Sequence, residues 1–250
     1  MKWYENATSN GDPRGLREQL KWQWDKDHIN ELLLELCGPI IPPSRSSVAL
    51  LSLAKADSCD PDYEDIMFEV CPRARVAEVT NIQDAMHFLQ LQVEDAAVVV
   101  TDPALLDSQY APVLDEVAAF GKAGGTAIFG LQVSEPHRMD DLQRVFRTYF
   151  GVPWQIELND STWFTLNDDF NAVFQGRTTC AAVPQQRLER AFNIMNAEPE
   201  DQVFMSNERL GASPAVFAHH GEGFVGWNDD VDISFGTIRL LLAMCGTWNR

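Results

Sequence analysis

From residue 46 onward, short continuous apolar runs alternate with stretches in which apolar residues recur every three or four positions. Continuous apolar runs are typical of strands buried on both faces, and the wider spacing is typical of amphipathic helices. Strands that alternate with helices of this length form βαβ units, so the pattern predicts a parallel sheet with helices on both faces. The predicted strands lie at 47–53, 75–80, 96–101 and 126–130, and the helices at 61–71, 81–91, 109–123 and 138–150.

Beyond Gly151 the pattern changes and predicts a hairpin-rich C-terminal third. Two apolar runs flank Asn159-Asp160, whose side chains are typical of turns, so we expect an antiparallel pair there. The segments concerned are the pair at 154–158 and 163–166, a mixed stretch at 168–212, a β-hairpin at 215–219 and 224–227, and a closing amphipathic helix at 233–245.

The N-terminal residues have a different character. Apolar side chains at helical spacing run from Leu16 to Cys37, and Gly38-Pro39 is a typical helix stop. We therefore expect residues 1–45 to form an N-terminal helical arm and linker, and residues 46–250 to form the α/β domain.

The composition narrows the range of partners. The 250 residues include 19 basic and 37 acidic side chains, a formal charge of −18, which repels nucleic acids and anionic lipid surfaces. We therefore expect neither nucleic acid nor membrane as a partner. In addition, the first residues lack the apolar stretch of a signal peptide. The five cysteines are odd in number and never spaced as C-x-x-C, which favours reduced thiols in the cytoplasm and no metal site. No motif indicates a cofactor.

Two regions carry a family resemblance. Residues 96–130 combine a strand, Asp102-Pro103, a helix, Gly124-Gly125-Thr126 and a further strand. This order resembles the core of class I glutamine amidotransferase-like proteins, and most of all their ThuA-like branch. The terminal segments 213–217 and 221–226, followed by a helix, resemble the end of the same branch. The resemblance covers about residues 46–246 and implies a flavodoxin-like open sheet.

A group of uncharacterised fungal proteins within this superfamily is similar as well. The motifs that carry this likeness are Phe129-Gly130-Leu131-Gln132, Phe150-Gly151-Val152-Pro153-Trp154, Phe164-Thr165-Leu166-Asn167 and Ala243-Met244-Cys245-Gly246.

One departure from the family pattern bears on activity. The resemblance implies a Cys nucleophile on the sharp turn after the fourth strand, but Leu131 stands at that position. A leucine side chain cannot form a thioester. We therefore expect no glutaminase activity by the Cys-His-acid mechanism.

The candidate site lies just past the carboxyl ends of the strands, where open parallel sheets bind ligands. His137, beside Glu135 and Arg138, offers acid, base and anion-binding groups on one loop. Asp102-Pro103 could instead simply cap the turn into the next helix, which is the favoured interpretation, and Arg138 could pair with Glu135 or Asp141. The candidate catalytic residues are Glu135, His137 and His219, and the candidate ligand-binding residues are Asp102, Gln132, Ser134 and Arg138.

Two further motifs favour structural interpretations. The segment Gly221–Gly226 matches G-x-G-x-x-G, but it lacks a following helix and acid within a βαβ unit, so we expect a hairpin turn. Neighbouring residues of a strand point to opposite faces, so His219 and His220 cannot easily bind one ion. We expect one imidazole to be exposed and the other half-buried.

Two functions follow. In the first, an amidotransferase-like protein binds or transforms a small polar molecule at the carboxyl edge of the sheet without a Cys nucleophile. In the second, the protein is a non-catalytic interaction protein, and the 16–37 helix forms a homodimer or docks another partner.

Overall fold

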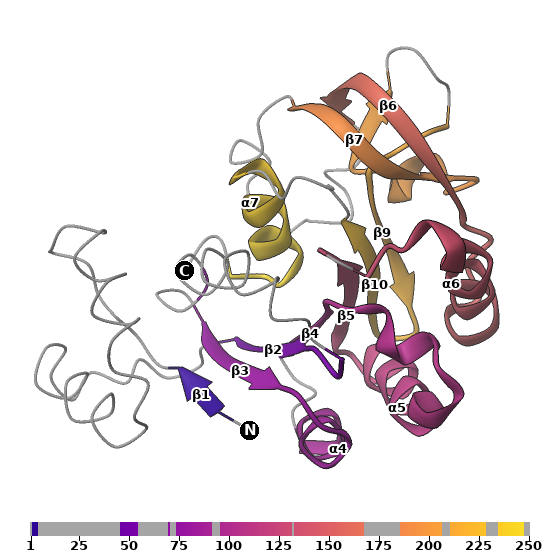
Figure 1. Cartoon of the computed structure of the whole chain (residues 1–250). Coiled ribbons are helices and arrows are strands. Elements are labelled where there is room, and N and C mark those ends of the chain that lie inside the picture. Colours follow the sequence, from indigo (N-terminus) through magenta and orange to yellow (C-terminus); the bar gives the residue numbers. More distant parts are fainter. Residues whose placement is uncertain are drawn as a thin grey trace, which may run out of the picture.

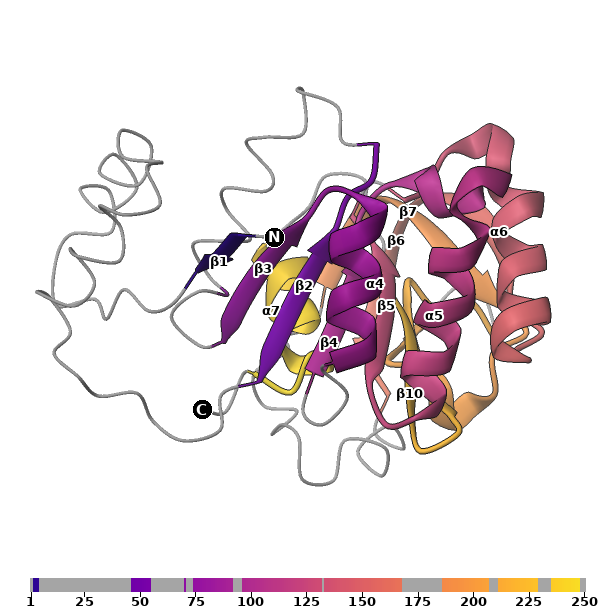
Figure 2. The same cartoon turned by 90° about the horizontal axis from the view of Figure 1, so that it is seen from below.

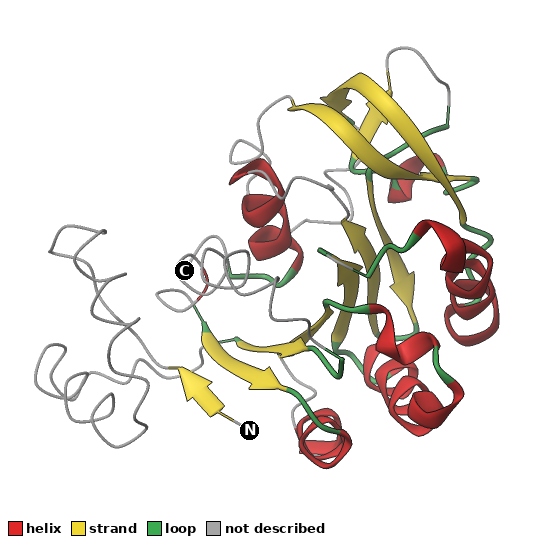
Figure 3. Ribbon diagram, viewed as in Figure 1, coloured by secondary structure: helices red, strands yellow, loops and turns green. Residues whose placement is uncertain are grey.

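A computed structural model of the chain describes residues 2–4, 46–54, 70, 74–91, 96–131, 133–167, 186–206, 211–228 and 235–247. These residues form one large and one small β-sheet with helices packed around the large one (Figures 1 and 3). Within this part of the chain, no helix is long and apolar enough to cross a membrane.

The large sheet confirms the α/β prediction. Its order is β1-β3-β2-β4-β5-β10-β9. The inner strands β3, β2, β4, β5 and β10 pair in parallel, whereas β1 and β9 pair antiparallel at the two edges. Counted along the chain, the parallel strands have the order 2-1-3-4-5, which is that of flavodoxin-like sheets. The strands are β1 (Lys2–Tyr4), β2 (Ser47–Leu51), β3 (Arg75–Val79), β4 (Ala96–Val100), β5 (Thr126–Gly130), β9 (Ala215–His220) and β10 (Gly223–Asn228).

Helices cover both faces of this sheet, as predicted. Helices α4 (Ile82–Leu91), α5 (Ala111–Lys122) and α6 (Met139–Val145) lie on one face, and α7 (Phe235–Met244) lies on the other (Figure 2). Side chains alternate along each strand, so Leu51 of β2 packs in the core beneath α4 to α6, and Leu50 packs in the core that includes α7. Both side chains are almost fully buried. The continuous apolar runs therefore reflect burial on two faces.

The small sheet corrects one prediction. Residues predicted as an antiparallel pair around Asn159-Asp160 form one continuous strand, β6 (Gln155–Leu166). Its partners are β7 (Gln186–Met195) on one side and β8 (Phe204–Ser206) on the other, both antiparallel. Asn159 and Asp160 pair with Ala191 and Arg190 of β7, so tertiary pairing overrides the turn preference of these residues.

The small sheet joins the large one at the carboxyl end of β10. The indole N–H of Trp227 donates to the carbonyl of Phe192 in β7 over 2.9 Å. The amide of Val203 donates to the carbonyl of Ala215, which in turn pairs with Asn228 at the end of β10. The small sheet therefore stands beside the edge of the large sheet where ligands bind in open α/β folds.

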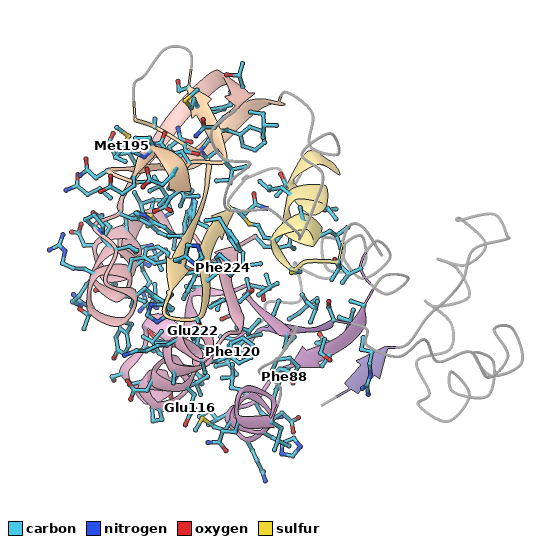
Figure 4. The ribbon with its side chains drawn as sticks, turned by 180° about the vertical axis from the view of Figure 1, so that it is seen from behind. Phe88, Glu116, Phe120, Met195, Glu222 and Phe224 are labelled. Carbon is cyan, nitrogen blue, oxygen red and sulfur yellow. The ribbon has the colours of Figure 1, made fainter. Side chains whose placement is uncertain are left out.

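The β9–β10 hairpin confirms the structural interpretation of the G-x-G-x-x-G segment. Gly221 and Glu222 form the turn, and Gly221 has a positive φ of 64°. A Cβ atom on Gly223 would lie 2.1 Å from the carbonyl oxygen of Gly125, so only glycine allows this approach. In Figure 4, Glu222 lies at the hairpin tip, well away from Met195 in the small sheet.

The N-terminal region is described in part. Residues 2–4 form β1, which pairs with β3 at the edge of the large sheet. The helix expected at 16–37, and with it the division between arm and domain, lies outside the described residues and stays a prediction. In the helix predicted at 61–71 only Val70 is described, and it is helical and buried.

Candidate functional site

The turn after β5 has a strained backbone. Leu131 directly follows the strand and has φ of 67°, in the left-handed region that disfavours residues other than glycine. Its side chain is buried in the core on the α7 face. The turn is tight because β5 and β10 approach closely here: a Cβ on Gly130 would lie 2.2 Å from the carbonyl oxygen of Asn228. The chain therefore turns sharply at the end of β5, with an apolar side chain at the strained residue.

Ser134 lies three residues past this turn, on the loop that leads to α6. Its hydroxyl oxygen is buried and has no hydrogen-bond partner in the described part of the chain. Val133, its neighbour, is packed into the core beneath α6 and fixes this part of the loop. A buried hydroxyl without a partner costs about 1–3 kcal/mol, so Ser134 favours a function over a purely structural role. Gln132 lies outside the described residues, and its role stays a prediction.

Glu135 and His137 form a pair at the surface of the same loop. The Oε2 atom of Glu135 lies 3.3 Å from Nε2 of His137, and the side chains are 40% and 78% exposed. A carboxylate next to an imidazole is a common arrangement in general acid–base catalysis. An exposed pair of this kind contributes only about 0–1 kcal/mol to stability. The structure brings these two predicted residues together, close in sequence to Ser134.

Arg138 is engaged with protein groups rather than open to a ligand. Its side chain is 17% exposed, and its Nη1 atom lies 2.8 Å from Oδ1 of Asp107 and 3.4 Å from the carbonyl oxygen of Pro103. Its Nε atom lies 3.7 Å from Oδ2 of Asp141, one of the two partners considered from the sequence. Glu135, the other, contacts His137 instead. Arg138 therefore ties the loop after β5 to the loop after β4.

Asp102 lies directly after β4 and is 7% exposed. Its Oδ1 atom accepts a hydrogen bond from the amide of Ala104 over 2.9 Å, which caps the short 3₁₀ helix Pro103–Leu106. Its Oδ2 atom accepts from the hydroxyl of Ser52 over 3.1 Å and from the amide of Ala54 over 2.8 Å. The capping role considered from the sequence is confirmed, and both carboxylate oxygens are engaged with the protein.

His219 does not join this group. It pairs with Phe224 in the hairpin, and Phe224 is level with Thr126, the first residue of β5. His219 therefore lies at the amino end of the parallel strands, opposite to the loop after β5. Its ring is exposed and lies 4.6 Å from that of Phe224. A shared site with His137 is excluded by this placement.

His220 is half-buried, with Nε2 3.1 Å from the carbonyl oxygen of Ala118. The prediction of one exposed and one half-buried imidazole is confirmed. Across the described segments, no group of three or more His, Cys, Asp or Glu side chains is placed to hold a metal ion.

Two residues at the carboxyl edge of the large sheet were not predicted as part of the site. Ser52 donates a hydrogen bond to Asp102, and Asp107 forms an ion pair with Arg138. Ser52 was included in the predicted strand 47–53, although β2 ends at Leu51 and places it at the carboxyl edge. Ser52 is the one polar side chain in the run 48–53, and this was the available signal. Asp107 had no such signal, because its partner is 31 residues away in the chain.

Comparisons with known proteins support the fold. No protein-family model matches the chain, and no curated protein matches it. Among solved structures, a β-galactosidase from Bacillus circulans sp. alkalophilus aligns with a TM-score of 0.45 and 14% identity over 79% of this chain, which spans 30% of that enzyme. A putative ThuA-like protein from Bacteroides uniformis aligns with a TM-score of 0.50 and 8% identity, over 81% of this chain and 91% of that protein.

At these identities the likeness concerns the fold alone. The fold of this chain is ThuA-like, and thus amidotransferase-like, in agreement with the family resemblance found in the sequence.

Proposed function

We propose that this protein binds a small polar molecule at the carboxyl edge of its large sheet, in the loop after β5, and does not hydrolyse glutamine. The observation that carries the proposal is the buried hydroxyl of Ser134, which has no partner among the described residues. It lies just past a strained turn whose residue, Leu131, supports no nucleophilic step. A ligand that bonds Ser134 would satisfy the hydroxyl and offset the cost of its burial.

The charges of the loop favour a neutral or cationic ligand over an anion. Arg138, the cation expected to bind a carboxylate, is already paired with Asp107 and Asp141. The groups that remain for a ligand are the hydroxyl of Ser134, the carboxylate of Glu135 and the imidazole of His137. Hydroxyl and carboxylate oxygens accept hydrogen bonds, so a molecule with amine or hydroxyl groups fits this set. The Glu135–His137 pair supplies a proton relay if the bound molecule is also transformed.

Thermal-shift screening followed by calorimetry tests the proposal. The panel consists of small amines, polyols and amides, each matched with a carboxylate of similar size. For an amine that binds, Glu135→Gln and Ser134→Ala should each weaken binding about tenfold or more, the scale of a hydrogen bond to a charged group. Asp115→Asn, which makes the same charge change at an exposed position of α5, should leave the affinity unchanged.

The outcomes are distinct. If Asp115→Asn weakened binding as much as Glu135→Gln does, the loss of affinity would come from the change in overall charge and not from the loop. Unchanged affinity in both loop variants would place the ligand elsewhere. Proton NMR of the mixture over several hours shows whether the ligand is only bound or also converted.

The alternative function, docking of a second copy or another partner through the 16–37 helix, depends on residues outside the described part of the chain. Sedimentation of the full chain and of its Trp24→Asp variant tests it, because a charge on the apolar face of that helix should dissociate a dimer formed there.

A further inference from the structure

The topology of the large sheet contains one switch point, between β2 and β4. From β2 the chain moves to β3 on one side, and it then crosses back to β4 on the other side. In open α/β sheets the loops diverge at such a point and leave a crevice at the carboxyl ends of the two strands, where ligands bind. In this protein the switch point lies between Ser52, just past β2, and Asp102, just past β4, and we call the space between these two residues the crevice.

Donors from two loops converge in this crevice. The hydroxyl of Ser52 and the amide of Ala54 come from the loop after β2, and the amide of Ala104 comes from the loop after β4. Their distances to the acceptor oxygens are 3.1, 2.8 and 2.9 Å. Ser52 is 1% exposed and the acceptor residue 7% exposed, so water is almost excluded. Hydrogen bonds from amides to a charged, buried acceptor are stronger than those between neutral groups.

The acceptor at the centre of these donors is the side chain of Asp102. Oδ1 accepts the hydrogen bond from Ala104, and Oδ2 accepts those from Ser52 and Ala54. A cap of the following 3₁₀ helix needs only the bond to Ala104. The two bonds to the loop after β2, formed across 48 and 50 residues of sequence, go beyond that role. They give the crevice the hydrogen-bonding pattern of a site for a planar anion with two oxygens.

We propose that the switch point of this sheet is a carboxylate-binding site, which the protein fills with its own Asp102. The tethered carboxylate holds the loops after β2 and β4 together and keeps external anions out of the crevice. An external ligand of this protein therefore binds beside the switch point, not in it. This inference rests on the sheet topology and the donors of the crevice, and it does not depend on the ligand proposed for the loop after β5.

Chemical rescue of the full-length Asp102→Ala variant tests the inference. The substitution removes the carboxyl group and keeps Cβ, so formate has the shape of the missing group. We expect the melting temperature to fall by about 5 °C or more, and to rise again with formate in a saturable manner. Formate has three non-hydrogen atoms, so its dissociation constant should be no lower than about 1 mM. Sodium chloride at equal ionic strength is the control for salt effects.

Three comparisons decide the result. The parent protein and the exposed-site variant Asp115→Ala should show no rise with formate beyond that in sodium chloride. The double variant Ser52→Ala/Asp102→Ala should require several times more formate, because one donor is lost. A rise in Asp102→Ala no larger than in sodium chloride, or an equal rise in the parent, would overturn the proposal.

A second variant covers the case in which Asp102→Ala does not fold. Asp102→Asn keeps the shape but presents an amide N–H₂ group to donors, so one of the three bonds must be lost. Its melting temperature should fall further than that of Ser52→Ala, which removes one donor only. A melting temperature equal to that of the parent would show that the crevice does not require a carboxylate, and the proposal would be wrong.

Discussion

The strained turn after β5 leads to a prediction in which the usual order of stability of alanine and glycine variants is reversed. At most positions alanine is more stabilising than glycine, because glycine loses more conformational freedom on folding. At Leu131, with φ of 67°, the left-handed backbone disfavours any residue with a Cβ atom. We therefore expect Leu131→Gly to be more stable than Leu131→Ala, although both variants lose the buried isopropyl group and glycine also lacks Cβ.

The magnitudes follow from the structure. Leu131 is 5% exposed, so truncation to alanine should lower the free energy of unfolding by about 2–5 kcal/mol. The left-handed conformation costs an L-residue about 1–2 kcal/mol, which glycine does not incur. Against this, the unfolded chain with glycine is more flexible, at a cost of about 0.4–1 kcal/mol. The difference leaves Leu131→Gly more stable than Leu131→Ala by about 0–1.6 kcal/mol, with a midpoint near 0.8 kcal/mol.

Urea denaturation followed by tryptophan fluorescence measures both free energies. Leu142 provides the matched control, since it is fully buried in the ordinary helix α6. There Leu142→Gly should be less stable than Leu142→Ala by about 1 kcal/mol. The same order at both positions, with alanine the more stable, would refute the left-handed turn at Leu131.

Three further predictions concern activity, pH and packing. The purified protein should release no more ammonia from glutamine than a heat-inactivated control; activity abolished by replacing any one cysteine would contradict this. Burial raises the pKa of Asp201 from its ordinary 3.8 to about 6, so the folded state binds the proton more tightly and stability falls as pH rises from about 4 to 6. In urea titrations at several pH values across this range, the free energy of unfolding of Asp201→Asn should gain about 1 kcal/mol relative to that of the parent, after allowance for solvent screening. A difference between the two proteins that stays constant with pH would count against the raised pKa of Asp201. Gly130→Ala should lower the free energy of unfolding by about 2 kcal/mol or more, because its Cβ would collide with the backbone of Asn228; a melting temperature equal to the parent's would contradict the close approach of the strands.

The parallel strands were predictable because their signal is local. Each buried strand is a short apolar run, such as residues 96–100, and each crossover helix has its own periodicity. The small sheet was not predictable in the same way. Strand β6 contains Asn159-Asp160, which favours a turn, and its pairing with β7 is formed by residues about 30 positions away. Its continuity depends on a partner that the local pattern does not reveal.

The location of the candidate site in the fold could be predicted from the sequence, but the contacts between its side chains could not. Ligand sites of open sheets lie past the carboxyl ends of strands, and this rule placed Asp102 and residues 133–138 at the carboxyl edge, where the structure has them. His219 was included because of its residue type, but the antiparallel hairpin carries it to the other end of the sheet. The ion pair between Arg138 and Asp107 is likewise a tertiary contact, so the sequence could indicate a cation but not its partner.

These contacts explain why the charged residues of the edge are less available to a ligand than their number indicates. Asp102 links the loops after β2 and β4, and Arg138 links the loops after β4 and β5. The residues just past three neighbouring strands, β2, β4 and β5, that make these contacts are thus held in place before any ligand arrives, which lowers the conformational entropy that binding would otherwise cost. The buried hydroxyl of Ser134 lies on the last of these loops and has no partner in the described residues. Since Arg138 already holds its part of the loop, the affinity of a ligand should depend mainly on the bonds that it forms with that hydroxyl and with Glu135.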